Sequence, residues 1–294
     1  MRRIVVAMMM AMTAASAQTA DLPDLTDLPI LRGGFRDGLS TGTRNWRGFY
    51  VGGQAGYAAA NVDFGRATSS MTDFMLRNAV LQSELHDWTL LGKNDIQTTG
   101  FGGFVGRNWQ WDDAVLGLEI SYSHMSGFET SSANVLARRI TNPIGSNPPP
   151  NHTYFYDTTL AGGAAVKVHD VMTFRARAGW AAGIFMPYAF GGLAVGRIDS
   201  SRFATITGTR TDRFEDTSTT PATVTETTVG LAPLGLVESR TNNFVAGYTL
   251  GLGTEMALFG NLFARAEWEY VKFLKVKDIS IGMNTVRAGL GYRF

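Results

Sequence analysis

The sequence contains no cysteine, little charge and no long apolar run. Without cysteine, the 294-residue chain can form no disulfide and no thiol nucleophile, so only histidines and carboxylates remain as metal ligands. Charged residues make up 17% of the chain, below the usual quarter, which excludes a disordered polyelectrolyte. No stretch of 18 apolar residues is present, which excludes a helical membrane protein. A net charge of +1 gives no reason to expect nucleic acid as a partner.

The first residues have the pattern of an export signal. Arg2 and Arg3 precede an apolar run from Ile4 to Met12, and the small residues Ala15-Ser16-Ala17 follow. This pattern predicts a signal peptide over residues 1–17, because the apolar run is too short to span a bilayer as an anchor helix. Residues 18–45 have no clear periodicity, and we expect a periplasmic N-terminal tail there. The alternative is a plug or a docking segment for a partner.

From Trp46 onwards, apolar and polar residues alternate with the period of two that is typical of half-buried strands. One set of positions is almost free of charge, whereas the other gathers nearly all of it. Aromatic residues stand at strand ends on the apolar face, at Trp180, Trp268, Tyr270, Tyr292 and Phe294. An apolar outer face with aromatic ends and a polar inner face indicates a transmembrane β-barrel. A closed barrel also satisfies every backbone hydrogen bond in lipid.

The expected fold is all-β, an eight-stranded antiparallel transmembrane up-and-down β-barrel with long extracellular loops. We expect the strands at residues 46–58, 96–110, 114–126, 164–181, 184–200, 242–257, 260–272 and 281–294. Long loops at 59–95, 127–163 and 201–241 alternate with short turns. The barrel domain, from the first expected strand to the last, covers residues 46–294. Because short turns face the periplasm in such barrels, both termini are expected there.

The three long loops carry patterns of their own, and loops of this length are usually functional or disordered. Between Thr72 and Trp88, apolar residues recur at helical spacing, which predicts a short amphipathic helix that covers the barrel mouth or contacts lipid or a partner. Residues 147–151, Asn-Pro-Pro-Pro-Asn, indicate a stiff irregular segment. Residues 204–228 are rich in threonine, and we expect a hairpin that turns near residues 216–221. Such strands either recognise a ligand or merely tolerate solvent.

Several motifs resemble those of a known family. Residues 46–53 read WRGFYVGG, residues 102–110 read GGFVGRNWQ, and residues 287–294 read RAGLGYRF. Together they are similar to the small outer-membrane β-barrel proteins of alphaproteobacteria, the porin-family or OmpA-type barrels. The resemblance covers residues 46–294 apart from the loops. It implies that Tyr292 and Phe294 form a signal for the barrel-assembly machinery, and that the protein lies in the outer membrane.

The inward positions carry both signs of charge in nearly equal numbers. An eight-stranded barrel has room inside only for its own side chains, so these charges must pair or hydrate. One interpretation is a salt-bridged interior that holds the barrel rigid, and the alternatives are a narrow charged pore or a gated switch. The expected lumen network comprises Glu119, Lys167, Arg175, Arg177, Glu255, Arg265, Glu267, Glu269 and Arg287.

Evidence for catalysis is thin. The sequence has neither an H-E-x-x-H nor a G-x-S-x-G motif, so no metal or organic cofactor is expected. His124 and Ser126 share a face, and Asp170 is expected level with His124 on the neighbouring strand. A lipid-facing Ser-His-acid set of this kind would hydrolyse lipid esters, and the His-x-Ser spacing looks like that of outer-membrane lipid A deacylases. This remote hypothesis requires Asp170 to lie within hydrogen-bond reach of His124.

The sequence therefore favours a protein that is not an enzyme. It is an integral outer-membrane barrel that supports envelope integrity and displays surface loops. A small, low-conductance porin for passive diffusion of small solutes is the second hypothesis, and the lipid hydrolase is the third. The expected partners are outer-membrane lipid and lipopolysaccharide, periplasmic chaperones, the barrel-assembly machinery and an extracellular ligand bound through the loops.

Overall fold

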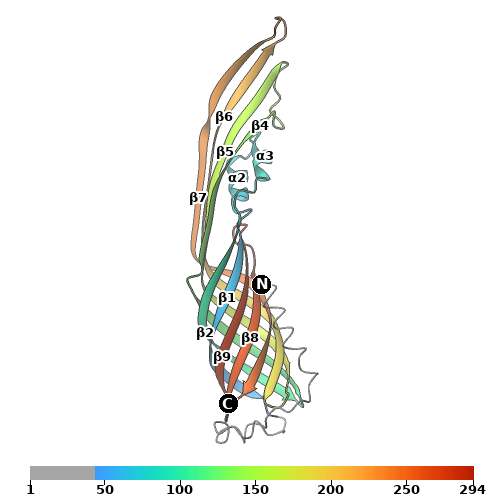
Figure 1. Ribbon diagram of the computed structural model, residues 1–294, viewed down its shortest axis with the longest axis vertical. Helices are drawn as coiled ribbons and strands as arrows, with labels where there is room; N and C mark the ends of the chain where they lie inside the picture. The colour runs from blue at the N-terminus through green and yellow to red at the C-terminus, as the bar shows by residue number, and fades with distance from the viewer. Residues whose placement is uncertain (1–43) are drawn as a thin grey trace, which may run out of the picture. The chain divides into compact units, whose positions relative to one another are not determined.

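The computed structural model describes residues 44–294, so the predicted signal peptide (1–17) and nearly all of the predicted tail (18–45) lie outside the described residues. Among the described residues, no helix is both long and apolar enough to cross a membrane. The elements in chain order are β1 (Gly48–Asp63), α2 (Ser69–Met75), α3 (Gln82–His86), β2 (Lys93–Trp111), β3 (Ala114–Ser126), β4 (Glu129–Thr141), β5 (His152–Trp180), β6 (Phe185–Asp216), β7 (Thr223–Ala257), β8 (Leu262–Phe273) and β9 (Ser280–Arg293) (Figure 1).

Within residues 44–294, eight of the strands close into an antiparallel barrel (Figure 1). Each barrel strand pairs with the next, except that β3 pairs with β5 because β4 stands apart. The first and last strands complete the ring, with Tyr50 opposite Arg293 and Asp63 opposite Ser280. This arrangement confirms the predicted fold. The strand ends in the barrel also lie close to the predicted ones, with β3 at the predicted bounds.

The barrel wall shows the alternation that the sequence predicts. Its outward positions expose large apolar side chains, which include Leu118, Ile120, Leu250, Leu252, Val286 and Leu290. Trp180, Trp268 and Tyr292 are also exposed on this face. The inward positions between them are buried, as the strictly alternating burial of β3 and β8 shows. A wall of this kind is suited to lipid outside and to packed side chains inside.

Three barrel strands are far longer than a membrane requires. β5, β6 and β7 have 29, 32 and 35 residues, whereas a transmembrane strand needs about 9–11. Their distal parts form a second sheet with β4, and we call this sheet the extension: β4, residues 152–168 of β5, 199–216 of β6 and 223–240 of β7. The threonine-rich hairpin is present, and β6 and β7 meet at a turn over residues 217–222. The expected loop 127–163, by contrast, is mostly a strand pair.

The segment between β1 and β2 covers one face of the extension. Two short helices, α2 and α3, replace the single helix predicted from Thr72 to Trp88. The chain turns between them at Asn78, whose positive φ of 64° interrupts a helix. Leu81, Leu85 and Trp88 are buried as expected, but Phe74 is exposed. The buried residues pack with Leu160, Val166, Ile198 and Ile206 in one apolar cluster, which we call the extension core.

The two ends of the barrel differ in the length of their connections. Residues 112–113, 181–184 and 258–261 make short turns at the end where β1 begins and β9 finishes. The extension and the β8–β9 connection lie at the other end (Figure 1). Because short turns face the periplasm in outer-membrane barrels, we expect the extension to point to the cell exterior.

Candidate functional site

A network of buried charges fills the middle of the barrel. Four arginines alternate with four glutamates, and each of these side chains is at most 5% exposed. Arg265 Nη2 lies 2.6 Å from Glu119 and 2.8 Å from Glu255. The charges sum to zero, and each of the four carboxylates is buried with at least two guanidinium partners. The members are Glu119, Arg175, Arg177, Glu255, Arg265, Glu267, Glu269 and Arg287.

Neutral polar side chains complete the network. The Tyr50 hydroxyl donates to Glu119 at 2.7 Å, and the Tyr188 hydroxyl donates to Glu267 at 2.5 Å. Thr249 donates to Glu269 at 2.8 Å. These bonds occupy carboxylate lone pairs that the arginines leave free, which a buried ion cluster needs in order to be stable.

Aromatic rings and apolar layers enclose the network on both sides. The guanidinium of Arg265 stacks 3.7 Å from the centre of the Phe104 ring, and that of Arg177 lies 3.9 Å from the Tyr188 ring. Towards the short turns, a buried apolar layer contains Trp46, Val115, Ala181, Met186 and Ala257. Towards the extension, the inward side chains of β8 and β9 are again apolar, namely Val271, Phe273, Ile281 and Met283. An ion crossing the barrel would have to disrupt the two apolar layers and the charged network between them.

A small polar space lies beside the network. Gln54, Ser123, Thr285 and Arg287 border a cavity of about 10 Å³, and the Gln54 amide donates to Ser121 at 2.8 Å. A cavity of this size holds about one water molecule. It is therefore too small for a solute.

Lys167 does not belong to the network, which corrects the prediction. Its side chain is exposed and lies 3.6 Å from Glu129 of β4. The cause is a β-bulge in β5, where Val168 pairs with Ile198 and Asp170 pairs with Arg197, so that His169 is an extra residue. One extra residue exchanges the two faces of a strand. Beyond the bulge, the odd-numbered Lys167 therefore faces away from the barrel interior that Arg175 faces.

His124 and Asp170 do meet, at the outer rim of the barrel. His124 Nδ1 lies 2.8 Å from Asp170 Oδ1, so the acid is within the reach that the hydrolase hypothesis required. The same carboxylate also accepts hydrogen bonds from Tyr122 at 2.7 Å and from Arg197 at 2.6 Å. Within residues 44–294, no hydrogen bond joins the Ser126 hydroxyl to His124. The pair is formed, but the nucleophile is not engaged.

The last residues and the potential metal ligands are also placed. Tyr292 and Phe294 are exposed on the outer face, with ring centres 5.2 Å apart, and the Phe294 amide donates to the Phe49 carbonyl at 2.8 Å. The described part of the chain contains no group of three or more histidines and carboxylates that could hold a metal ion. Each of the four histidines instead contacts one aspartate.

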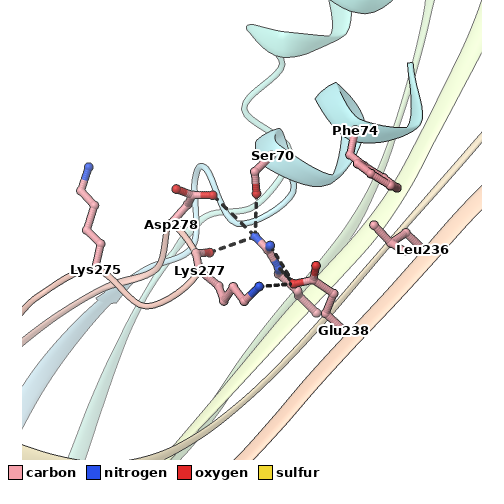
Figure 2. A pocket seen from close by; sticks show the side chains of 8 residues that line it. Ser70, Phe74, Leu236, Glu238, Lys275, Lys277 and Asp278 are labelled. Atoms are coloured by element: carbon pink, nitrogen blue, oxygen red, sulfur yellow. Dashed lines mark hydrogen bonds and ion pairs between the residues drawn. The ribbon is translucent and has the colours of Figure 1, made fainter. Parts of the chain in front are cut away.

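A cavity of about 590 Å³ opens at the junction of the barrel rim and the extension (Figure 2). Arg202 lines it and donates to Glu238 at 2.8 Å, to Ser70 at 3.0 Å and to the Lys277 carbonyl at 3.1 Å. Hydrogen bonds from Lys277 and Arg202 lower the pKa of Glu238 below its ordinary value. Because Arg202 is already bonded to three elements of the chain, this site joins α2, the β8–β9 connection and the extension.

Sequence reasoning missed Tyr50, Tyr188 and Arg202. Tyr50 lies on the inward face of β1, where its neighbours on the same face are Gly48 and Gly52. The alternation along β1 could therefore have predicted that Tyr50 faces the barrel interior. Tyr188 alternates with the buried Met186 and Phe190, but the glycines and alanines of β6 obscure which face is inward. Arg202 lies in the predicted long loop 201–241, before the expected hairpin, and only the three-dimensional packing shows that it is buried.

Comparisons with known proteins agree with this architecture. A profile of the family described as "Outer membrane protein beta-barrel domain" matches residues 4–294. The chain is 26% identical over 307 aligned positions to the 31 kDa outer-membrane immunogenic protein of Brucella melitensis, with all of both chains covered. It is 26% identical over 260 positions to the 22 kDa outer membrane protein of Rhizobium leguminosarum, covering 85% of this chain and 79% of the relative.

Among solved structures, the N-terminal β-barrel domain of Pseudomonas aeruginosa OprF is similar, with 11% sequence identity and a TM-score of 0.31. The match covers 82% of this chain and 97% of that domain. The family match and the named relatives show that this is an outer-membrane protein, as the sequence predicts. The chain belongs to the outer membrane protein β-barrel domain family.

Proposed function

We propose that this protein is a closed, non-conducting, non-enzymatic anchor that displays the extension on the cell surface and supports envelope integrity. The observation that carries the proposal is the interior network, in which four arginines and four glutamates are paired and buried between two apolar layers. Opening a path for solutes would break several charge-assisted hydrogen bonds at once, each of which is worth more than a neutral one. The porin hypothesis is therefore the less favoured one.

Single-channel recording in a planar bilayer tests this proposal. Residues 18–294 would be refolded, checked by heat-modifiable electrophoretic mobility, and compared with a known open porin in the same bilayer. We expect no current steps. Discrete steps whose ion selectivity changes in Glu267→Gln, but not in Lys167→Gln, would instead establish a charged pore and refute the closed anchor.

Display at the surface is supported by the length of β5–β7 and by the relative's name, since the Brucella protein is called an immunogenic outer-membrane protein. An epitope tag after Ser218, in the turn of the long hairpin, should bind antibody on intact cells. The matched control places the tag at Gly183, in a short turn, where binding should require permeabilised cells. The reverse result would show that the barrel has the opposite orientation.

The lipid-hydrolase hypothesis retains one supporting observation, the 2.8 Å contact between His124 and Asp170. The hydrogen bonds from Tyr122 and Arg197 to the same carboxylate favour a structural role, because they already fix and neutralise it. We therefore expect purified protein to release no fatty acid from lipopolysaccharide or phospholipid vesicles. Release that disappears in Ser126→Ala, while folding is unchanged, would establish the hydrolase.

The remaining partners follow from the same proposal. Tyr292 and Phe294 at the end of β9 are offered as the signal that the barrel-assembly machinery reads, after periplasmic chaperones deliver the unfolded chain. Lipopolysaccharide would surround the outer rim, and an extracellular ligand would meet the extension. Replacing Phe294 with Ala should lower the amount of folded protein in the outer membrane, whereas Phe259→Ala, an exposed aromatic in a short turn, should not.

A further inference from the structure

The lipid-facing wall contains one feature that neither the closed interior nor the extension explains. Arg107 lies on the outward face of β2 and is exposed among apolar side chains. Its guanidinium lies 4.8 Å from the centre of the Phe49 ring and 5.2 Å from that of Trp109. None of the ion pairs formed within residues 44–294 involves Arg107. A charged side chain on the lipid face of a barrel is destabilising unless it meets a counter-charge or the interface.

A groove on the same wall begins at Arg107. It has a volume of about 730 Å³, within the range of small-molecule sites, and it is lined by Phe49 of β1 and by residues of β2, β3, β5 and β6. Two small outward-facing residues, the cross-strand partners Ala176 and Gly191, form its floor. Apart from Arg107, its exposed side chains are apolar and include Val105, Leu118, Ile120, Phe174 and Leu193, whereas Glu119 and Arg175, which also line it, have buried side chains. The groove has a charged end and an apolar length, which match the anionic headgroup and the acyl chain of a lipid.

The direction of the groove agrees with one leaflet. Arg107 is four residues before Trp111, the periplasmic end of β2, whereas Leu193 is eight residues after Phe185, the periplasmic end of β6. The charged end thus lies nearer the periplasmic surface, and the apolar end reaches deeper into the bilayer. Stacking on Trp109 lets the guanidinium reach towards that surface, as long cationic side chains at membrane interfaces do.

We propose that this groove binds a phospholipid of the periplasmic leaflet, with its phosphate on Arg107 and one acyl chain along the groove. Arginine suits this role because its planar guanidinium pairs with two phosphate oxygens at once. The aromatic rings on either side hold the guanidinium in place before the lipid arrives. The site is independent of whether the barrel interior conducts.

Native mass spectrometry of the folded protein in mild detergent tests the proposal, with dioleoylphosphatidylglycerol as the probe. The wild-type protein should retain one bound phospholipid, and Arg107→Gln should bind it roughly tenfold or more weakly. Ala176→Phe should also weaken binding, because this exposed position lies on the groove floor and its new ring would fill the acyl path. Arg47→Gln is the matched control, an exposed arginine at the same end but outside the groove.

All variants must first show the heat-modifiable mobility of a folded barrel. Retention that is unchanged in both Arg107→Gln and Ala176→Phe would overturn the proposal. Equal loss in Arg47→Gln would also overturn it, because the attraction would then be general rather than local. Retention of lipopolysaccharide in preference to the phospholipid would assign the groove to the wrong leaflet and equally refute it.

Discussion

In β5, the barrel and the extension bury opposite kinds of side chain. Thr173, Arg175 and Arg177 face the barrel interior, whereas Leu160 and Val166 face the extension core. The difference reflects what lies outside each part. Lipid surrounds the barrel, so its apolar side chains face outwards and polar ones must find each other inside. Water surrounds the extension, so its apolar side chains face inwards.

The sequence of β5 does not reveal this reversal. Even-numbered positions from Val166 to Trp180 are apolar except for Asp170, on both sides of the bulge. The bulge at His169 moves this set from the lipid side below it to the core side above it. In β7, Thr241 and Asn242 oppose the single residue Asp199, and Asn242 has a positive φ of 54°. One extra residue in each of two strands therefore adapts a continuous pattern to two solvents.

Deleting His169 should have the largest effect, because it should destabilise the extension and leave the barrel folded. The deletion would turn Lys167 towards the core and expose Leu160 and Val166, at a cost of about 1.5–3 kcal/mol for each large apolar side chain. The extension should unfold while the barrel persists. Hydrogen exchange should show lost protection in residues 152–168 and retained protection in residues 171–180. Protection retained in both parts would mean that the bulge does not set the faces.

Removing a charge from the interior should have the next largest effect. Arg265→Ala leaves Glu119, Glu255 and Glu267 with one partner fewer in a dry site, which should cost about 3–5 kcal/mol. Urea unfolding of the refolded barrel in lipid vesicles measures this change. Because the extension core makes no use of Arg265, its protection should remain. A change below about 1 kcal/mol would mean that water already hydrates the network.

Acid should weaken the junction between the two regions. The pKa of Glu238 is lowered by hydrogen bonds from Lys277 and Arg202, so its stabilising contribution is complete above its unfolded pKa of about 4.3. It is lost as the pH falls through the lower folded pKa. Hydrogen exchange in the distal parts of β6 and β7 should accelerate below about pH 4, beyond the intrinsic pH effect. Glu238→Gln should already be weakened at pH 7 and should flatten this dependence.

The exposed pair between Lys167 and Glu129 should matter least. Both side chains are about half exposed or more, and such pairs contribute roughly 0–1 kcal/mol. Lys167→Ala should therefore unfold in urea within that margin of the wild-type protein. A loss comparable to that of Arg265→Ala would mean that Lys167 reaches the interior after all, as the alternation in the sequence predicts.

Much of the barrel can be predicted because lipid requires apolar side chains at the outward positions of each strand, while the polar ones face inwards. Glu119, Arg175, Arg265 and Arg287 occupy inward positions that alternation alone assigns. The sequence does not show where along each strand the lipid-facing alternation ends and the extension begins. The strand over residues 129–141 has no buried residue. Residues 156–162 do alternate in burial, but Thr158 and Gly162 are among the buried positions, so the sequence there shows no apolar period of two. The helix predicted from Thr72 to Trp88 failed at Asn78, because apolar spacing does not register a backbone turn.

The filled interior also has a consequence for assembly. Once β1 has paired with β9 and the arginines and glutamates have met, no passage remains through which a hairpin could be threaded. If the extension lies on the outer side of the membrane, as proposed, β4 and the distal parts of β5–β7 have to cross while the barrel is still an open sheet, before the seam between the first and last strands is sealed. Closure of that seam is then an irreversible commitment, because the exported hairpins cannot be withdrawn through a barrel that their own strands have completed.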